Sequence, residues 1–193
     1  MTIRALCFAT LFPAATLLAP QAATAAFTVF GNGMAQICSE TAKAMERGIK
    51  APPNAIELCT TAIENESLPQ RDLAGTYINR GVLYLARGGY REAKQDFDSA
   101  IAIMPAIGEA YTNRGAALLG LQLYGDAIAD IDRGLALNPG EPEKAYFNRG
   151  LAEEALDNIP AAYRDYSRAA ELKPGWTLPL NELSRFTVST RGS

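Results

Sequence analysis

The sequence contains no histidine among its 193 residues. Histidine is the commonest general base in enzymes and the commonest metal ligand, so its absence argues against most metal centres and most acid–base catalysis. A Gly-rich phosphate loop, a G-x-S-x-G elbow, an H-E-x-x-H helix and a C-x-x-C pair are also missing from the sequence. We therefore expect a protein that is not an enzyme and that holds no metal and no cofactor.

A strong excess of one charge is missing as well. The chain has 18 Lys and Arg against 21 Asp and Glu, which gives a formal net charge of −3, and the two signs are interspersed. Proteins that bind nucleic acid carry a basic patch or stripe. The charge pattern therefore predicts no nucleic-acid partner.

The amino-terminal segment, residues 1–26, differs in composition from the rest of the chain. Arg4 is its single charge, an apolar run covers residues 5–19, and small residues of the A-x-A type follow. This order is typical of a secretory signal peptide. The apolar run of about 15 residues is shorter than the roughly 20 of a membrane-spanning helix. We expect cleavage after Ala25 or Ala26, a periplasmic or secreted protein of the bacterial cell envelope, and no membrane insertion of the mature chain.

Cysteine is scarce, with three in the whole chain. Removal of residues 1–26 leaves only Cys38 and Cys59, an even pair in an oxidising compartment, so a structural disulfide is expected. It would stabilise the fold by about 3 kcal/mol through loop closure. The alternative is two reactive thiols, which the lack of a C-x-x-C spacing disfavours.

A short motif occurs three times between residues 77 and 150. It reads YINRG at 77–81, YTNRG at 111–115 and YFNRG at 146–150. A catalytic site needs one such cluster, whereas a fixed period of about 34 residues is the mark of a repeat architecture. The chain therefore divides into three copies of one unit, with small residues aligned at Gly81, Gly115 and Gly150 and prolines at Pro105, Pro139 and Pro174. The copies span 74–107, 108–142 and 143–176.

Each copy contains two helical patterns separated by turn signals. The first helix of the unit is predicted over 70–87, 107–120 and 142–156. The second helix is predicted over 90–103, 124–137 and 160–172. Proline after the second helix ends it and begins the turn to the next copy. The predicted fold class is all-α.

This pattern resembles the tetratricopeptide repeat family, whose 34-residue unit has fixed large, small and aromatic positions. In the first copy these positions hold Tyr77, Gly81, Tyr84, Tyr90, Ala93, Phe97, Ala100 and Pro105. The resemblance covers about 100 residues. It implies a right-handed α-solenoid of stacked antiparallel helix pairs with one concave face.

The flanking regions extend the array. Residues 27–72 are predicted to form a divergent helix pair over 33–47 and 54–64, which the expected disulfide would join. Residues 177–193 are predicted to form a capping helix over 177–188 and a tail. A terminal unit has one neighbour instead of two, so it needs another source of stability.

Two polar patterns recur in register with the repeat. Arginines and aspartates at fixed positions predict structural ion pairs, an interpretation that outweighs a catalytic one; they are Arg80, Arg114 and Arg149 with Asp96, Asp130 and Asp165. The resemblance places a second set on the concave, partner-binding face: Asn79, Asn113 and Asn148 with Ile78, Val82, Thr112, Lys144, Phe147 and Leu151. An asparagine ladder can bind the main chain of an extended segment. Alternatively, each asparagine bonds a neighbouring helix and sets the superhelical pitch.

We therefore expect a non-catalytic adaptor of the cell envelope that docks a protein or peptide partner on its concave face. The alternatives are a small-ligand carrier or enzyme built on the same scaffold, and a structural subunit of an envelope assembly. One sub-class of the family binds the carboxylate tails of chaperones through a clamp of Lys, Asn and Arg. Its first-copy positions here hold Glu40 and Ala44, or Ile78 and Val82, so the sequence does not support that specificity.

Overall fold

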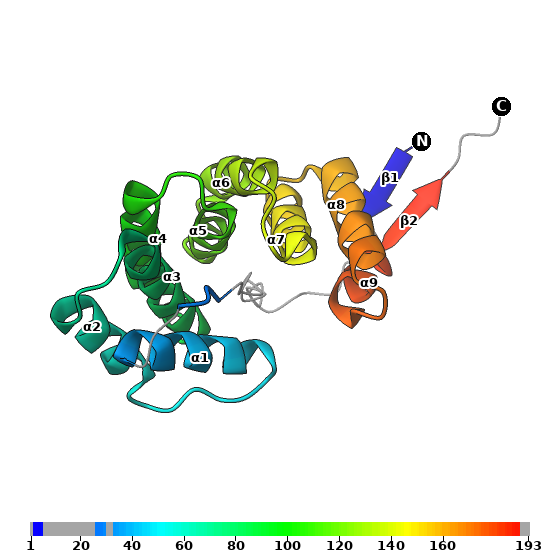
Figure 1. Ribbon diagram of the computed structural model, residues 1–193. Helices are drawn as coiled ribbons and strands as arrows, with labels where there is room; N and C mark the ends of the chain where they lie inside the picture. The colour runs from blue at the N-terminus through cyan, green and yellow to red at the C-terminus, as the bar shows by residue number, and fades with distance from the viewer. Residues whose placement is uncertain (1, 6–25, 30–32, 190–193) are drawn as a thin grey trace.

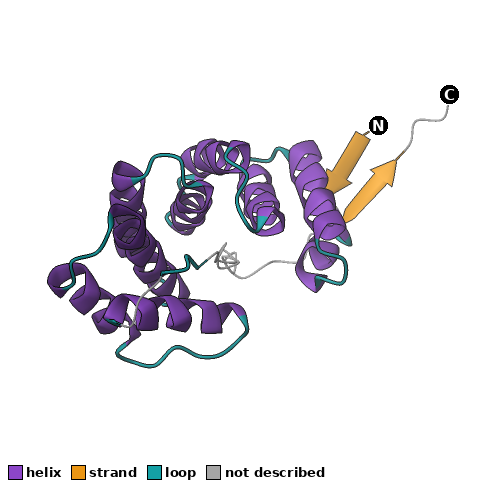
Figure 2. Ribbon diagram, in the orientation of Figure 1, coloured by secondary structure: helices purple, strands orange, loops and turns teal. Residues whose placement is uncertain are grey.

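A computed structural model describes residues 2–5, 26–29 and 33–189 of the chain. In these ranges the chain forms helices packed in consecutive pairs and two short strands (Figures 1 and 2). The helices are α1 (Met34–Glu46), α2 (Ala55–Asn65), α3 (Gln70–Ala86), α4 (Tyr90–Ile103), α5 (Gly108–Gly120), α6 (Tyr124–Ala136), α7 (Pro142–Ala155), α8 (Ile159–Leu172) and α9 (Thr177–Leu183). The strands are β1 (Thr2–Ala5) and β2 (Phe186–Ser189).

The pairs stack into a curved array. Helices α3, α5 and α7 lie on its inner side, α4, α6 and α8 lie on its outer side, and α1 faces the inner helices from the opposite side of the curve (Figure 1). From α1 to α8, every helix begins and ends within one residue of the range expected from the sequence. The all-α prediction is confirmed.

The turn between the two helices of each unit uses the same backbone device three times. Gly88, Gln122 and Asp157 follow the first helix of successive units and have positive φ angles of 75°, 63° and 61°. Glycine adopts this conformation without steric cost, whereas Gln and Asp give up about 1 kcal/mol. The left-handed residue ends one helix and reverses the chain, so the next helix packs antiparallel.

The core of each unit is built by a glycine on the first helix and a large side chain on the second. A Cβ atom at Gly81 would lie 2.6 Å from Phe97 Cε1, and one at Gly150 would lie 2.7 Å from Tyr166 Cε1. Phe97 and Tyr166 are fully buried. The aligned glycines are therefore needed because the partner side chain rests directly on the helix backbone.

The carboxyl-terminal end differs from the expected capping helix. Helix α9 ends at Leu183, and β2 pairs antiparallel with β1, from Thr2 opposite Ser189 to Ala5 opposite Phe186. Leu180 of α9 is 48 % exposed. Leu183 and Phe186 pack instead in the hydrophobic cluster around Tyr166, because the helix stops early and the chain turns back. Strand pairing between the two ends of the chain leaves no signal in a local pattern.

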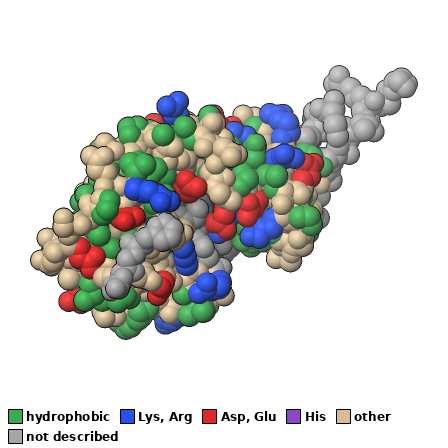
Figure 3. Space-filling view, viewed as in Figure 1, with side chains coloured by type: hydrophobic (Ala, Val, Ile, Leu, Met, Phe, Trp, Pro, Cys, Tyr) green, Lys and Arg blue, Asp and Glu red, His purple; other side chains and the backbone are tan. Residues whose placement is uncertain are grey.

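The predicted signal peptide falls mostly at residues 6–25, which lie outside the described residues. Strand β1 belongs to the same predicted leader. Within the described part of the chain, each helix is too short or too polar to cross a bilayer. Lys and Arg side chains alternate with Asp and Glu over the visible face (Figure 3).

Candidate functional site

Asn79, Asn113 and Asn148 lie at matching positions on the three inner helices α3, α5 and α7. We call the surface that these helices present inside the curve the concave face. All three asparagine side chains are 0 % exposed. Burial of an amide is stable only when its donors and acceptor find partners, so the partners of these three side chains decide their role.

Asn79 has its partners in a short extended segment, Ala26–Val29, which we call the N-terminal strap. The Phe27 N–H donates to Asn79 Oδ1 over 2.7 Å, and Asn79 Nδ2 donates to the Phe27 carbonyl oxygen over 3.0 Å. The amide thus binds both main-chain groups of one residue. Figure 1 shows the strap inside the curve, between α1 and the inner helices.

Helix α1 holds the strap from the other side. Ser39 Oγ donates to the Phe27 carbonyl oxygen over 2.7 Å, and the Val29 N–H lies 3.4 Å from Ser39 Oγ as a long hydrogen bond. Lys43 Nζ lies 2.5 Å from the hydroxyl of Thr28. The strap therefore lies between α1 and α3 much as a bound peptide would.

Asn113 and Asn148 differ from Asn79. Within the described residues, the side-chain nitrogen and oxygen of both have no hydrogen-bond partner although both residues are fully buried. Each unpaired buried group costs about 1–3 kcal/mol. Two equivalent amides thus have unused capacity for the same bidentate contact that Asn79 makes.

The apolar side chains predicted for the concave face are packed to different degrees. Ile78 and Val82 are fully buried and belong to the same core cluster as Ala42 of α1. Phe147 is 1 % exposed, and its ring centroid lies 5.6 Å from that of Tyr166. These three side chains are thus already covered.

The remaining predicted residues of this face are Thr112, Lys144 and Leu151. Thr112 is 3 % exposed, and its hydroxyl donates to the Glu109 carbonyl oxygen over 3.2 Å. Lys144 and Leu151 are half-buried, and Lys144 pairs with Glu141 over 2.6 Å. The exposed apolar area that the sequence suggested for this face is therefore small, and its distinguishing feature is the asparagine amides.

The arginines and aspartates that recur with the repeat meet in all three copies. Each guanidinium makes two parallel hydrogen bonds to the aspartate sixteen residues later, on the second helix of the same unit. The pairs are Arg80 with Asp96 at 2.9 and 2.7 Å, Arg114 with Asp130 at 2.6 and 2.7 Å, and Arg149 with Asp165 at 2.8 and 2.7 Å. This fork geometry fixes orientation as well as charge, so these groups position helices.

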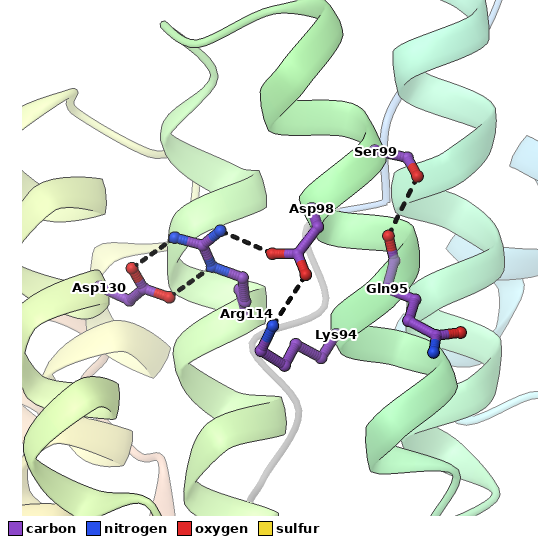
Figure 4. Close-up of polar contacts among 6 residues, drawn as sticks. All are labelled: Lys94, Gln95, Asp98, Ser99, Arg114 and Asp130. Carbon is purple, nitrogen blue, oxygen red and sulfur yellow. Dashed lines mark hydrogen bonds and ion pairs between the residues drawn. The ribbon is translucent and has the colours of Figure 1, made fainter.

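A second acid from the preceding unit, which the sequence analysis missed, completes the arrangement. Arg114 Nη1 donates to Asp98 over 2.7 Å, and Asp98 also accepts from Lys94 over 2.8 Å (Figure 4). Arg149 reaches Asp132 in the same way, whereas Arg80 reaches the hydroxyl of Thr60. Asp98 and Asp132 lie 34 residues apart, so their recurrence was the available signal.

The pKa shifts of these arginines and aspartates agree with a structural role. The hydrogen bonds to Asp130 and then to Asp98 raise the pKa of Arg114, with burial acting against them. Burial acts to raise the pKa of Asp98, but the hydrogen bonds from Lys94 and Arg114 together outweigh it, and the pKa is lowered. Both groups thus stay charged and paired at neutral pH, and neither is poised for proton transfer.

Cys38 of α1 and Cys59 of α2 form a disulfide with a Cα–Cα distance of 5.0 Å. Both residues are fully buried. The bond joins the two helices of the divergent first pair, and Ser39, the next residue on α1, holds the strap. The disulfide therefore stabilises α1, the helix that holds the strap opposite α3.

Cavities also lie elsewhere on the protein. One of about 280 Å³ is lined by Lys94, Arg114, Leu118, Asp126, Ala129 and Asp130, and its Arg114 and Asp130 are paired with each other. Among the described residues, His, Cys, Asp and Glu side chains do not gather into a cluster that could hold a metal ion. The asparagines of the concave face remain the best candidate site.

Comparison with solved structures places the fold. The first TPR domain of the human RPAP3 protein is 32 % identical with a TM-score of 0.54, and the match covers 57 % of this chain and 87 % of that domain. The first TPR of Spaghetti (RPAP3), bound to the HSP90 peptide SRMEEVD, matches with the same values. MamA from Desulfovibrio magneticus RS-1 is 20 % identical with a TM-score of 0.60, covering 80 % of this chain and 84 % of that one, which shows likeness of fold alone.

Searches of protein-family models and of curated proteins gave no match.

Proposed function

We propose that this chain, which belongs to the tetratricopeptide repeat (TPR) family, is a non-catalytic adaptor of the bacterial cell envelope that docks an extended segment of a partner protein on its concave face. Asn113 and Asn148 bind the main chain of that segment. The stacked helix pairs keep the face in shape before binding, so little ordering is needed when the partner arrives.

One observation carries the proposal: Asn79 already holds an extended main chain. Its amide pairs with both the N–H and the carbonyl oxygen of Phe27. Asn113 and Asn148 stand at the same position in the next two units, with neither amide atom satisfied. Asn79 is fully buried while it holds the strap.

The relatives support the same class of partner. A TPR domain 32 % identical to this chain has been solved with a bound peptide. Binding through main-chain groups suits a neutral extended segment, because an amide offers donors and an acceptor but no charge. Positions 78 and 82 hold Ile78 and Val82 instead of Lys and Asn, so this chain lacks the first-copy part of the carboxylate clamp.

Replacing Asn113 and Asn148 together by alanine separates binding from stability. Capture from a cell-envelope extract, followed by peptide scanning of the captured protein, identifies the docked segment. The affinity for that segment should fall at least about tenfold in the Asn113→Ala/Asn148→Ala variant, since each lost hydrogen bond contributes about 1 kcal/mol. The melting temperature should stay the same or rise, because two unpaired buried amides are removed.

Asn181→Ala, at an exposed position on α9, is the matched control and should bind as wild type does. The acidic peptide SRMEEVD should bind more weakly than the captured segment. If the double variant melts at a clearly lower temperature and still binds, the asparagines set the helix packing and the proposal is wrong.

The cell-envelope location rests on the leader pattern in residues 1–26. The intact mass of the protein purified from a bacterial periplasmic fraction should correspond to a chain that begins at Ala26 or Phe27, with the Cys38–Cys59 bond formed. A full-length mass, or recovery from the cytoplasm with free thiols, would contradict the location and leave the docking face as proposed.

A further inference from the structure

The contacts around Phe27 carry an inference beyond the asparagine ladder. We propose that the surface of α3 around Asn79 and Gly75 is a docking site for an aromatic residue of an extended segment. Phe27 fills this site in the unbound protein, and an aromatic residue of the partner segment displaces Phe27. The partner in this statement rests on the proposed function; the site itself does not.

Both main-chain polar groups of Phe27, the N–H and the carbonyl oxygen, make hydrogen bonds. Its N–H donates to Asn79, and its carbonyl oxygen accepts from both Asn79 Nδ2 and Ser39 Oγ, at 3.0 and 2.7 Å. These groups come from α3 and α1, two helices that face each other across the strap. A main-chain unit bound from two helices in this way is a built position rather than a loop resting on a surface.

The ring of Phe27 packs directly against α3. A Cβ atom at Gly75 would lie 2.2 Å from Phe27 Cδ1, so the ring lies directly on the helix backbone where a side chain is missing. The guanidinium carbon of Arg71 lies 5.3 Å from the ring centroid, within the range of a cation–π interaction. Glycine beneath the ring and arginine beside it together select a flat aromatic side chain.

Of the three repeats, only the first has this position for an aromatic ring. The residues that align with Gly75 are Glu109 and Lys144, which lie 34 and then 35 residues further along the chain. Their long side chains leave no bare backbone for a ring to rest on. A partner that extends along Asn148 and Asn113 therefore meets one aromatic site, at its end, and that site already holds Phe27.

The strap is held by non-covalent contacts, each of modest strength, and a competing segment can therefore displace it. Its interactions include the bonds to Asn79 and Ser39, the contact of Thr28 with Lys43, the packing of the Phe27 ring against Gly75 and Arg71, and the burial of Val29. A net contribution of about 1 kcal/mol for each hydrogen bond is within reach of a competing peptide. A tethered segment competes as though present at millimolar concentration, which sets a threshold for the partner.

A peptide with the sequence of the strap tests the site without any partner. The blocked peptide acetyl-Ala-Phe-Thr-Val-amide is titrated to millimolar concentration into the purified protein, and binding is followed by NMR. The Phe27→Ala variant, whose aromatic site is free, should bind the peptide at least about tenfold more tightly than wild type, in which the tethered strap competes. Adding Gly75→Ala to Phe27→Ala should abolish binding, and acetyl-Ala-Ala-Thr-Val-amide should not bind.

Hydrogen exchange in otherwise unaltered protein gives a second measurement. In the Gly75→Ala variant, the side-chain amide hydrogens of Asn79 should exchange at least about tenfold faster than in wild type, because the new methyl group displaces the ring and with it the bond from Asn79 to the Phe27 carbonyl oxygen. Gly125→Ala is the matched control, since a Cβ at Gly125 meets nothing within 4 Å; its Asn79 side-chain amide should exchange as in wild type.

The results separate the two proposals. Equal peptide binding by wild type and Phe27→Ala, peptide binding by no variant, binding that survives Gly75→Ala, or an unchanged exchange rate in Gly75→Ala would each overturn the inference about Phe27. Partner capture that depends on Asn113 and Asn148 would still support the adaptor function in those cases. Peptide binding as expected, with no partner segment that needs the asparagines, would overturn the adaptor function and leave the aromatic site.

Discussion

Replacing Gly115 by valine should lower the free energy of unfolding by about 3 kcal/mol, the upper end of the cost of overpacking a core. A Cβ atom at this position would lie 2.5 Å from Ile131 Cγ1 and 3.1 Å from the carbonyl oxygen of Ala127. The second contact is with the backbone of α6, which cannot yield by changing a rotamer. The added carbons therefore force α5 and α6 apart. Thermal or urea unfolding followed by circular dichroism measures the loss.

A double-mutant cycle with Ile131→Ala tests whether the close contact is the cause. Ile131→Ala alone should cost about 2–5 kcal/mol by leaving a cavity. Combined with Gly115→Val, it should cost at least about 1 kcal/mol less than the sum of the two, because the new side chain occupies part of the space that isoleucine leaves. Strict additivity would contradict the contact.

Gly125→Ala provides the contrast. This glycine is exposed on α6, and a Cβ atom there meets nothing within 4 Å. The change should raise stability by up to about 1 kcal/mol, because alanine is the better helix former. The opposite signs at Gly115 and Gly125 would show that packing, rather than helix propensity, fixes the glycines of the repeat.

Removing the disulfide should have an effect of similar size. In the Cys38→Ala/Cys59→Ala variant the free energy of unfolding should fall by about 3 kcal/mol, as expected for losing a cross-link between residues 21 apart in the chain. The first helix pair is the end of the array and has one neighbouring unit, so it should unfold at a lower temperature than the three repeats. Differential scanning calorimetry, with and without a reductant, measures this.

Reduction provides the internal control. A reductant should lower the stability of wild type toward that of the double alanine variant and should leave the variant unchanged. The Asn79 side-chain amide should also exchange faster after reduction, because Ser39 follows Cys38 on the loosened helix and donates to the strap that Asn79 binds. A wild-type protein whose unfolding is unaffected by reductant would contradict a stabilising role for this bond.

The sequence predicts most of the fold because the same residue types recur at the same positions of each repeat. Gly81, Gly115 and Gly150 recur at fixed spacing with large residues on the following helix, and this spacing places the helix pairs correctly. The arginine pairs follow for the same reason. Asp98 and Asp132 recur too, but an acid two residues after another acid is easily taken for a solvated side chain.

The strap could not be found in this way. Phe27 and Asn79 are 52 residues apart, Phe27 belongs to no periodic pattern, and one main-chain contact leaves no trace in a single sequence. The pairing of β1 with β2 escapes prediction for the same reason, since its partners are the two ends of the chain. The burial of Ile78 and Val82 depends on where α1 packs, which the repeat pattern does not specify.

The position of the strap has a consequence for fusion proteins. The main chain of Phe27 is fixed at Asn79 inside the curve, so an affinity tag or reporter joined at Ala26 begins next to the docking surface and competes with whatever binds there. Strand β2, the last element that the structure describes, lies beyond α9 and away from helices α3, α5 and α7 (Figure 1). Bait proteins for the capture experiments should therefore carry their tags at the carboxyl end.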